Sequence, residues 1–210
     1  MSRYRAVRPV TRIGTAEEHV GRVQETERDP GIMDADELWA SVTTLDAYAA
    51  KTVEWLRGQL PKLPGYASSV DVDEDMAPGL TETLIALNKA GFLTRASQAG
   101  SVCTGADGDR WEQVAAVTGL ATRRIARWLQ RELHHTGFRA VTSRVRQASD
   151  GPFFGTPVTW MQGTEYTWFG AVSDLMLVPY DAEVALTIYD PVPGAERSLA
   201  DIVFSSIRAS

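Results

Sequence analysis

The stretch LIALNKAGFLTRASQAG (Leu84–Gly100) passes from a helical pattern into a strand pattern across one short connection. Leucines at positions 80, 84 and 87 recur at helical spacing and predict a helix over residues 80–90. Gly91 stands where a helix C-terminal glycine belongs, and residues 92–97 favour a strand. A helix that leads directly into a strand predicts a fold that mixes the two.

Two further helices and a β-rich second half extend this pattern. Apolar spacing predicts helices over residues 45–60, with Thr44 as N-cap, and over residues 122–135. The residues from Trp111 to Leu120 are typical of a strand, joined to the first by a loop over 100–109. Further strands are expected over 138–146, 156–161, 165–172, 175–180 and 183–190, while 198–207 fits either a strand or a helix. We predict an α+β fold: helices packed on one side of a mainly antiparallel sheet, with a β-rich C-terminal half.

Composition bounds the domain organisation and the classes of partner. Residues 1–35 are polar, and we expect them to form an arm ahead of a single α+β domain over residues 36–210. The net charge of −6 argues against general nucleic-acid binding, because nucleic-acid binders are basic. No secretory signal appears, and no apolar stretch approaches the ~20 residues of a membrane-spanning helix. We expect a soluble, cytoplasmic protein without membrane contacts, and a homo-oligomer stays open.

The sequence offers little for metal or cofactor chemistry. Cys103 is the only cysteine, so neither an intramolecular disulfide nor a thiolate metal cluster can form. The acidic run over residues 71–75, with Glu82, matches several positions of a calcium loop, but Met76 stands where that loop needs glycine. Acidic residues ahead of a helix explain the run through the helix dipole. Phosphate-binding glycine loops and nucleophile elbows are absent. We predict no metal and no cofactor.

Neutral polar side chains gather around the opening strand. Alternation along an unbroken strand places Thr94 and Gln98 on one face, and the strand that begins at Trp111 is expected to lie beside it. Amides and hydroxyls beside an aromatic ring suit recognition of a polar ligand, since they give directional hydrogen bonds without a titratable charge. The predicted ligand-binding residues are Thr94, Arg95, Ser97, Gln98, Trp111 and Gln113.

A basic stripe follows on the third predicted helix. Arg124, Arg127 and Arg131 share one helix face, opposite the apolar residues. Arginine suits bidentate contact with phosphate or carboxylate, and we therefore predict an anion-binding stripe. The alternative interpretation is a solvated face that pairs with the protein's own acids. His134 and His135 follow at the helix end, where cations are favoured without a catalytic role.

The segments LNKAGFLTRASQAG (Leu87–Gly100) and WEQVAAVTG (Trp111–Gly119) resemble an actinobacterial domain family of unknown function with an LNxxGFxTxxSQxG pattern. The resemblance covers about residues 38–137. It implies a bacterial or phage origin with a GC-rich genome, and the chain indeed has 18 Arg against 3 Lys. It marks the Ser97–Gln98 pair but implies no reaction.

These observations favour a non-catalytic binding or interaction protein that recognises a small polar or anionic ligand or a protein partner. The reason is that no complete catalytic constellation appears. One alternative is a small-molecule enzyme that uses Ser97 or Glu112, with His134 or His135 brought near by folding. A further alternative is a phage or structural assembly protein, which the basic N-terminal end and the aromatic β-rich half would suit.

Overall fold

The computed structural model describes residues 39–64, 79–146, 155–172 and 177–194 of the chain. These ranges contain three helices and eight strands. The strands form two antiparallel sheets of four strands each. The elements in chain order are α2 (Leu45–Leu56), α3 (Leu80–Lys89), β1 (Leu93–Gln98), β2 (Ser101–Thr104), β3 (Arg110–Gln113), β4 (Ala116–Ala121), α4 (Arg123–Leu133), β5 (Arg139–Ser143), β6 (Thr156–Met161), β7 (Thr164–Phe169) and β8 (Val184–Tyr189). The α+β prediction is confirmed, with the strands divided between two sheets.

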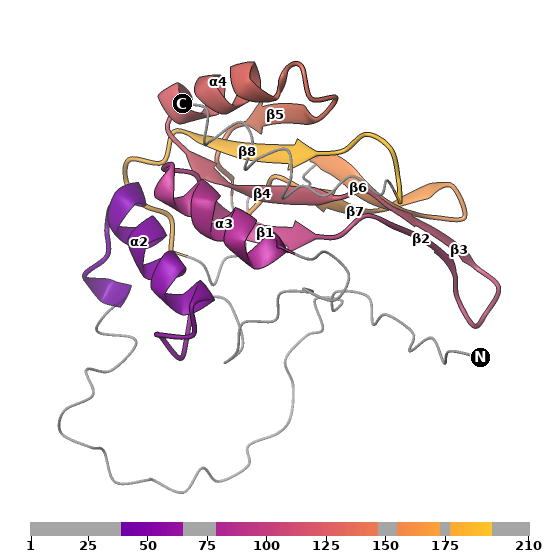
Figure 1. Cartoon of the computed structure of the whole chain (residues 1–210), viewed down its shortest axis with the longest axis horizontal. Helices are drawn as coiled ribbons and strands as arrows, with labels where there is room; N and C mark the ends of the chain where they lie inside the picture. Colours follow the sequence, from indigo (N-terminus) through magenta and orange to yellow (C-terminus); the bar gives the residue numbers. More distant parts are fainter. Residues whose placement is uncertain (1–38, 65–78, 147–154, 173–176, 195–210) are drawn as a thin grey trace, which may run out of the picture.

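The first sheet has the strand order β1-β4-β8-β5, and the described helices lie against it (Figure 1). Helices α2 and α3 pack on each other and contact β1, while α4 contacts β4, β5 and β8. The core between these layers includes Leu45, Leu87, Leu120 and Leu186, each at most 2% exposed. All six residues of β4 are buried. The helices therefore cover the centre of this sheet.

The second sheet has the order β2-β3-β6-β7 and projects beyond the helices (Figure 1). The buried cluster against this sheet is small: Val158 of β6 packs with Val114 and Ala116, which lie at the junction with the first sheet, and Trp160 packs against them. The outer strands, β2 and β7, expose three large apolar side chains: Val102, Tyr166 and Trp168. This sheet therefore gains less from burial than the first.

One long hairpin joins the two sheets. Strand β1 pairs with β4 in the first sheet, and their continuations β2 and β3 pair in the second. The prediction of a single strand from Trp111 to Leu120 is wrong, because the chain changes sheets between Gln113 and Ala116. The predicted loop over 100–109 likewise contains β2. Side-chain alternation does not reveal such a bend, since the strand pattern continues on both sides of it.

The helix boundaries follow the local signals with small corrections. Helix α2 begins after the predicted cap, where Thr44 Oγ1 accepts a hydrogen bond from Ala47 N at 3.2 Å. It ends at Leu56 rather than at residue 60, and Gly58 then takes a left-handed φ of 71°. Of the strand predicted over 175–180, the described residues 177–180 form none. The arm, the acidic run at 71–75 and residues 198–207 lie outside the described residues.

A hydrogen-bonded connection fixes β1 against α3. Gly91 has a φ of 87°, and the next amide, Phe92 N, donates to Leu87 O at 3.0 Å, which is the Schellman pattern of a helix end. Asn88 then reaches the strand: its Nδ2 donates to Thr94 Oγ1 at 2.7 Å, and its Oδ1 accepts from Thr94 N at 3.2 Å. The LN, GF and T of the motif thus all take part in one helix-to-strand connection.

Candidate functional site

A β-bulge at Arg95 changes which side chains of β1 lie together. Thr94 is opposite Gly119 and Gln98 is opposite Ala116, with a register shift between Thr94 and Ala96. Positions 116 and 119 lie on opposite faces of β4 because side chains alternate along a strand. Thr94 and Gln98 therefore face opposite sides of the sheet, and the prediction that they share a face is wrong.

The two glutamines of the predicted site both bond to backbone carbonyls near the junction of the sheets. Gln98 Nε2 donates to Val114 O and to Val158 O, both at 2.9 Å. Gln113 Nε2 donates to Ala99 O at 2.6 Å. The carbonyls of Ala99 and Val114 lie where the chain passes from one sheet to the other, and that of Val158 lies on β6 beside them. The amide donors are thus engaged by the protein's own backbone.

The other residues of the predicted group lie apart from this junction. Ser97 is half-buried on β1 opposite Val117. Trp111 lies on the second sheet, where its ring meets the Tyr166 ring edge-on at 4.9 Å. Arg95 is buried, with its guanidinium 4.5 Å from the centre of the Tyr48 ring. The six residues therefore do not form one surface group.

The residues of the enzyme alternative are also dispersed. Glu112 forms an ion pair with Arg110 at 2.7 Å on β3. His134 and His135 are exposed at the end of α4, with ring centres 4.8 Å apart. Within the described part of the chain, no hydrogen bond joins either histidine to Ser97 or Glu112. The described residues also contain no group of three or more His, Cys, Asp or Glu side chains placed to bind a metal ion.

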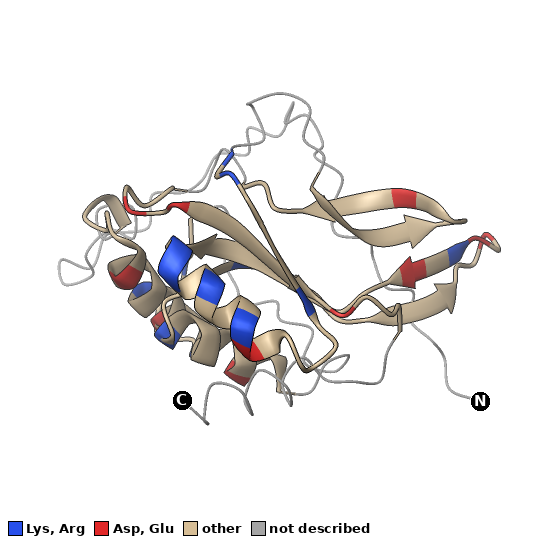
Figure 2. Ribbon diagram, turned by 90° about the horizontal axis from the view of Figure 1, so that it is seen from above, with Lys and Arg blue, Asp and Glu red and all other residues tan. Residues whose placement is uncertain are grey.

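The predicted basic stripe forms a solvent-facing side of α4. Arg124, Arg127 and Arg131 are all exposed, and Figure 2 shows the basic residues as blue bands along this helix. The neighbouring Arg123 lies 3.9 Å from a carboxylate oxygen of Glu183. No such ion pair joins the three stripe residues to an acid of the described chain. The three stripe residues are thus exposed and do not form ion pairs with the acids of the described chain.

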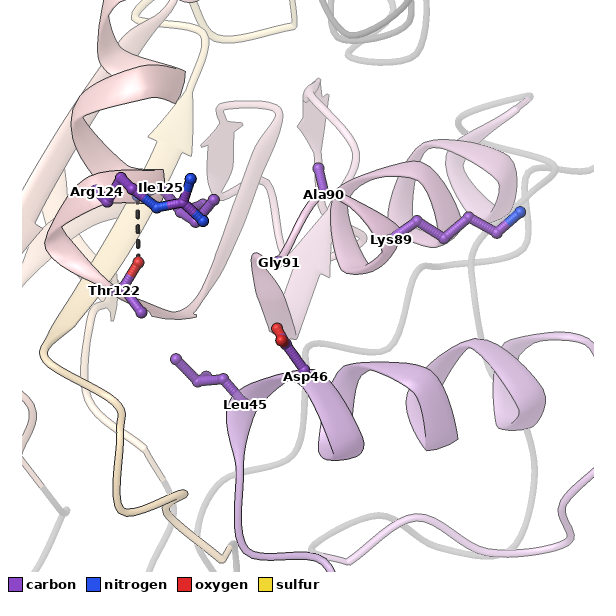
Figure 3. Close-up of a pocket in the computed structure, with 8 residues that line it drawn as sticks. All are labelled: Leu45, Asp46, Lys89, Ala90, Gly91, Thr122, Arg124 and Ile125. Carbon is purple, nitrogen blue, oxygen red and sulfur yellow. Dashed lines mark hydrogen bonds between the residues drawn. The ribbon is translucent and has the colours of Figure 1, made fainter.

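A pocket lies where the N-terminal end of this stripe meets the other helices (Figure 3). Its volume is about 400 Å³. The start of α2, the end of α3 and the start of α4 each contribute to the wall. We call it the helix-junction pocket. Its described lining residues are Leu45, Asp46, Lys89, Ala90, Gly91, Thr122, Arg124 and Ile125.

Two opposite charges point into the helix-junction pocket. The side chains of Asp46 and Arg124 extend into the space between the helices, whereas Lys89 extends along α3 away from Arg124 (Figure 3). No ion pair links Asp46 to Arg124, although both line the same pocket. The pocket therefore contains a carboxylate and a guanidinium group that do not form an ion pair with each other.

Arg124 also sits in an electrostatically unfavourable place. The first turn of α4 contains Arg123 and Arg124 but no acidic residue. A cation there opposes the positive end of the helix dipole, where an anion is favoured. Glu183 offsets the charge of Arg123 and accepts its backbone N–H at 2.8 Å. Arg124 has no such partner among the described residues. A bound anion would therefore offset the repulsion between its charge and the positive end of the helix dipole.

The segment before β8 holds the starts of both helices in position. Asp181 Oδ1 accepts the backbone N–H of Leu45 at 2.8 Å, at the start of α2. Two residues later, Glu183 accepts the N–H of Arg123 at the start of α4. Tyr180 N adds a backbone bond to Thr43 O at 3.1 Å. One short segment thus fixes the two helix ends that carry Asp46 and Arg124.

These features define a two-sheet α+β protein whose helix-covered face has a small pocket lined by both charged and apolar residues. The chain belongs to the family described as Domain of unknown function (DUF6919), which it matches over residues 34–208. No curated protein matches the chain in sequence. Among the described helices, none has the length and apolar character needed to cross a membrane.

Asp46 and Lys89 are pocket residues that the sequence did not single out. Both lie on helices whose apolar stripes were predicted, but their meeting point depends on how the helices pack. The sequence did contain one signal for Arg124. It occupies the first turn after the Thr122 cap, against the preference for acids at that end.

Proposed function

We propose that the protein is a non-catalytic binding protein for a small polar molecule with an anionic group, held in the helix-junction pocket. One observation carries the proposal: Arg124 faces a pocket of about 400 Å³ from the positive end of a helix, without an acidic partner among the described residues. Small-molecule pockets commonly occupy about 300–1,000 Å³. The pocket therefore has room for a metabolite of modest size.

The charges of the pocket indicate the class of ligand. Arg124 suits a carboxylate or a phosphate, because its planar guanidinium can donate two parallel hydrogen bonds. Asp46, on the facing helix, suits an amino or hydroxyl group of the same molecule. A dipolar ligand, such as an amino acid, would use both. The apolar wall from Leu45 and Ile125 would contact its carbon skeleton.

The pocket lining favours binding over catalysis. The hydroxyl among its residues belongs to Thr122, whose oxygen accepts a hydrogen bond from Ile125 N at 3.3 Å and so caps α4. Histidine and cysteine are absent from the lining residues that the structure describes. General acid–base chemistry usually relies on a titratable pair within hydrogen-bond reach of the substrate. Among the described lining residues, Asp46 and Lys89 are titratable, but no ion pair joins them, and Lys89 extends along α3 away from Arg124 (Figure 3).

A thermal-shift screen tests this function. The full chain is heated with amino acids, sugars and nucleotides, and the unfolding midpoint is compared with that of the protein alone. A ligand at 100 times its dissociation constant raises the stability by about 2.7 kcal/mol, because it binds only the native state. We expect amino-acid-like ligands with an anionic group to give the shift.

Matched variants locate the site. Arg124→Gln and Asp46→Asn should each abolish or strongly reduce the shift, whereas Arg127→Gln, one turn further along α4, should leave it unchanged. A shift that survives both pocket variants would contradict the proposed site. The strand site predicted from sequence is tested in the same assay. If Gln98→Ala or Gln113→Ala removes the shift and Arg124→Gln does not, the ligand binds at the strand.

We also infer a cytoplasmic location in an actinobacterial host or its phage. The LNxxGFxTxxSQxG pattern and the strong preference for Arg over Lys support the host, and a single cysteine is compatible with the cytosol. Fractionation of the native host, followed by detection of the full chain, would check the location. Recovery of the protein in the membrane or culture fluid would contradict it.

A further inference from the structure

The buried guanidinium of Arg95 is separate from the helix-junction pocket and lacks an acidic partner among the described residues. Arg95 is 3% exposed and sits at the bulge of β1. Arginine keeps its positive charge in proteins, so burial cannot be relieved by loss of a proton. No ion pair connects it to a carboxylate of the described chain. The local structure therefore contains a buried, uncompensated cation.

Two contacts stabilise this cation in part. Its Nη2 donates to the carbonyl oxygen of Leu177. Its guanidinium carbon lies 4.5 Å from the centre of the Tyr48 ring, within the range of a cation–π interaction. Neither contact supplies a negative charge. Both hold the side chain in one place, between α2, β1 and the chain near residue 177.

Several hydrogen-bond donors remain open around this contact. The Nε and Nη1 atoms of Arg95 are buried and have no hydrogen-bond partner. The hydroxyl of Tyr48, on the ring that the guanidinium covers, is also buried without a partner. Tyr48 is 0% exposed. Buried polar groups in native proteins are nearly always hydrogen-bonded, so such a set indicates a missing acceptor.

We propose that Arg95 and Tyr48 form an internal binding site for a small carboxylate anion. A carboxylate supplies the missing negative charge, and its two oxygens match the N–H groups of a guanidinium in a bidentate contact. The Tyr48 hydroxyl donates a further hydrogen bond to the anion. The bulge at Arg95 fits this role, because bulges redirect side chains at functional positions. The anion would tie α2 to β1 and so stabilise the helix-covered sheet. The inference does not depend on the proposed function of the helix-junction pocket.

The test uses the full chain and formate as the probe. Sodium formate replaces sodium chloride at constant ionic strength, and the unfolding midpoint is recorded at each step. The proposal predicts a saturable rise with formate, since a planar carboxylate binds bidentately and chloride does not. A midpoint that is the same in both salts means that water or screening alone satisfies Arg95, and it overturns the proposal.

Variants connect the effect to these side chains. Tyr48→Phe removes only the hydroxyl, and we expect it to weaken formate binding by about tenfold through the lost hydrogen bond. Arg95→Met should abolish the formate dependence, and if this variant fails to fold, Tyr48→Phe and Arg95→Lys still report on the site. Arg139→Gln, at an exposed arginine of β5 outside both proposed sites, serves as the matched control and should keep the wild-type formate response. An unchanged response in Tyr48→Phe and in the folded Arg95 variant overturns the proposal.

One further variant separates an exchangeable anion from an acid of the chain itself. Asp174 lies three positions before Leu177 in the sequence, outside the described residues. With an exchangeable anion, Asp174→Asn keeps the wild-type response to formate. If formate stabilises the protein only after this substitution, the counter-charge comes from Asp174 and the proposal is wrong.

Discussion

The two sheets share one long hairpin, which supplies two strands to each, yet they differ in what covers them. Strand β4 is buried along its whole length, whereas β3, which directly precedes it on the same length of chain, has no fully buried residue. The helices lie over β4 and its neighbours and leave the second sheet to project (Figure 1). Burial along this hairpin is therefore decided by the layer above each strand. We expect the first sheet to provide most of the stability and the second to open locally at lower cost.

The largest expected effect comes from removing a core aromatic ring under the helices. Phe92 is 0% exposed at the entry to β1, and Phe92→Ala should lower the free energy of unfolding by about 3–5 kcal/mol because it leaves a cavity. Tyr166→Ala on the second sheet, where the ring is 40% exposed, should cost about 1 kcal/mol, mainly its contact with Trp111. Urea unfolding of both variants makes the comparison. Equal losses would mean that the sheets contribute equally.

The next effect concerns the close approach of β1 to β4. A Cβ atom added at Gly119 would lie 2.9 Å from Thr94 Cα, beside the Arg95 bulge, so the backbone would have to move. Gly119→Ala should therefore cost about 3 kcal/mol, by overpacking. Gly163→Ala in the β6–β7 turn has open space around it and should cost about 1 kcal/mol, from its positive φ alone. Thermal unfolding of both variants measures the difference. An equal fall of the unfolding midpoint in both would mean that β1 and β4 can move apart without cost, and would contradict the prediction.

A smaller effect should appear at the junction between the sheets. Gln98→Leu leaves the carbonyls of Val114 and Val158 without their side-chain donor and should cost about 2 kcal/mol. Gln113→Leu removes one bond, to Ala99 O, and should cost about 1 kcal/mol. Hydrogen exchange should quicken in β6 while β8 stays protected. Faster exchange in β8 as well would show that the sheets unfold together.

The smallest effect should come from the surface of the second sheet. The Arg110 side chain is 62% exposed and pairs with Glu112 at 2.7 Å. Exposed pairs contribute little, so Arg110→Ala should change the free energy of unfolding by about 0.5 kcal/mol, and less at high salt. Urea unfolding at two salt concentrations measures this. A loss above about 2 kcal/mol would show that this strand contributes far more than its exposure implies.

Much of the fold was predictable because its signals are local. The Thr44 and Thr122 caps, the Gly91 helix end and the apolar stripes of the helices act within a few residues of the chain. The strands β5, β6 and β8 follow from runs of β-favouring residues between Gly and Pro. The division into two sheets was not predictable, since one strand pattern runs through the bend on each side of the hairpin.

The candidate site, in contrast to the fold, was mostly not predictable from the sequence. Arg124 and Arg95 were singled out by residue type, but their surroundings depend on contacts between distant segments. The helix-junction pocket needs residues 45–46, 89–91 and 122–125 to meet, and Arg95 meets Tyr48 and Leu177 from elsewhere in the chain. A single bulge then placed Thr94 and Gln98 on opposite faces, which alternation alone cannot anticipate.

The sequence by itself determined the α+β class and the starts of the helices. These depend on local backbone preferences and side-chain periodicity, which each segment carries alone. Only the tertiary structure decided that the hairpin spans two sheets, that Arg124 faces Asp46 across a pocket, and that Arg95 is buried. Burial and charge compensation are properties of what lies around a side chain, and packing brings those neighbours from distant parts of the chain.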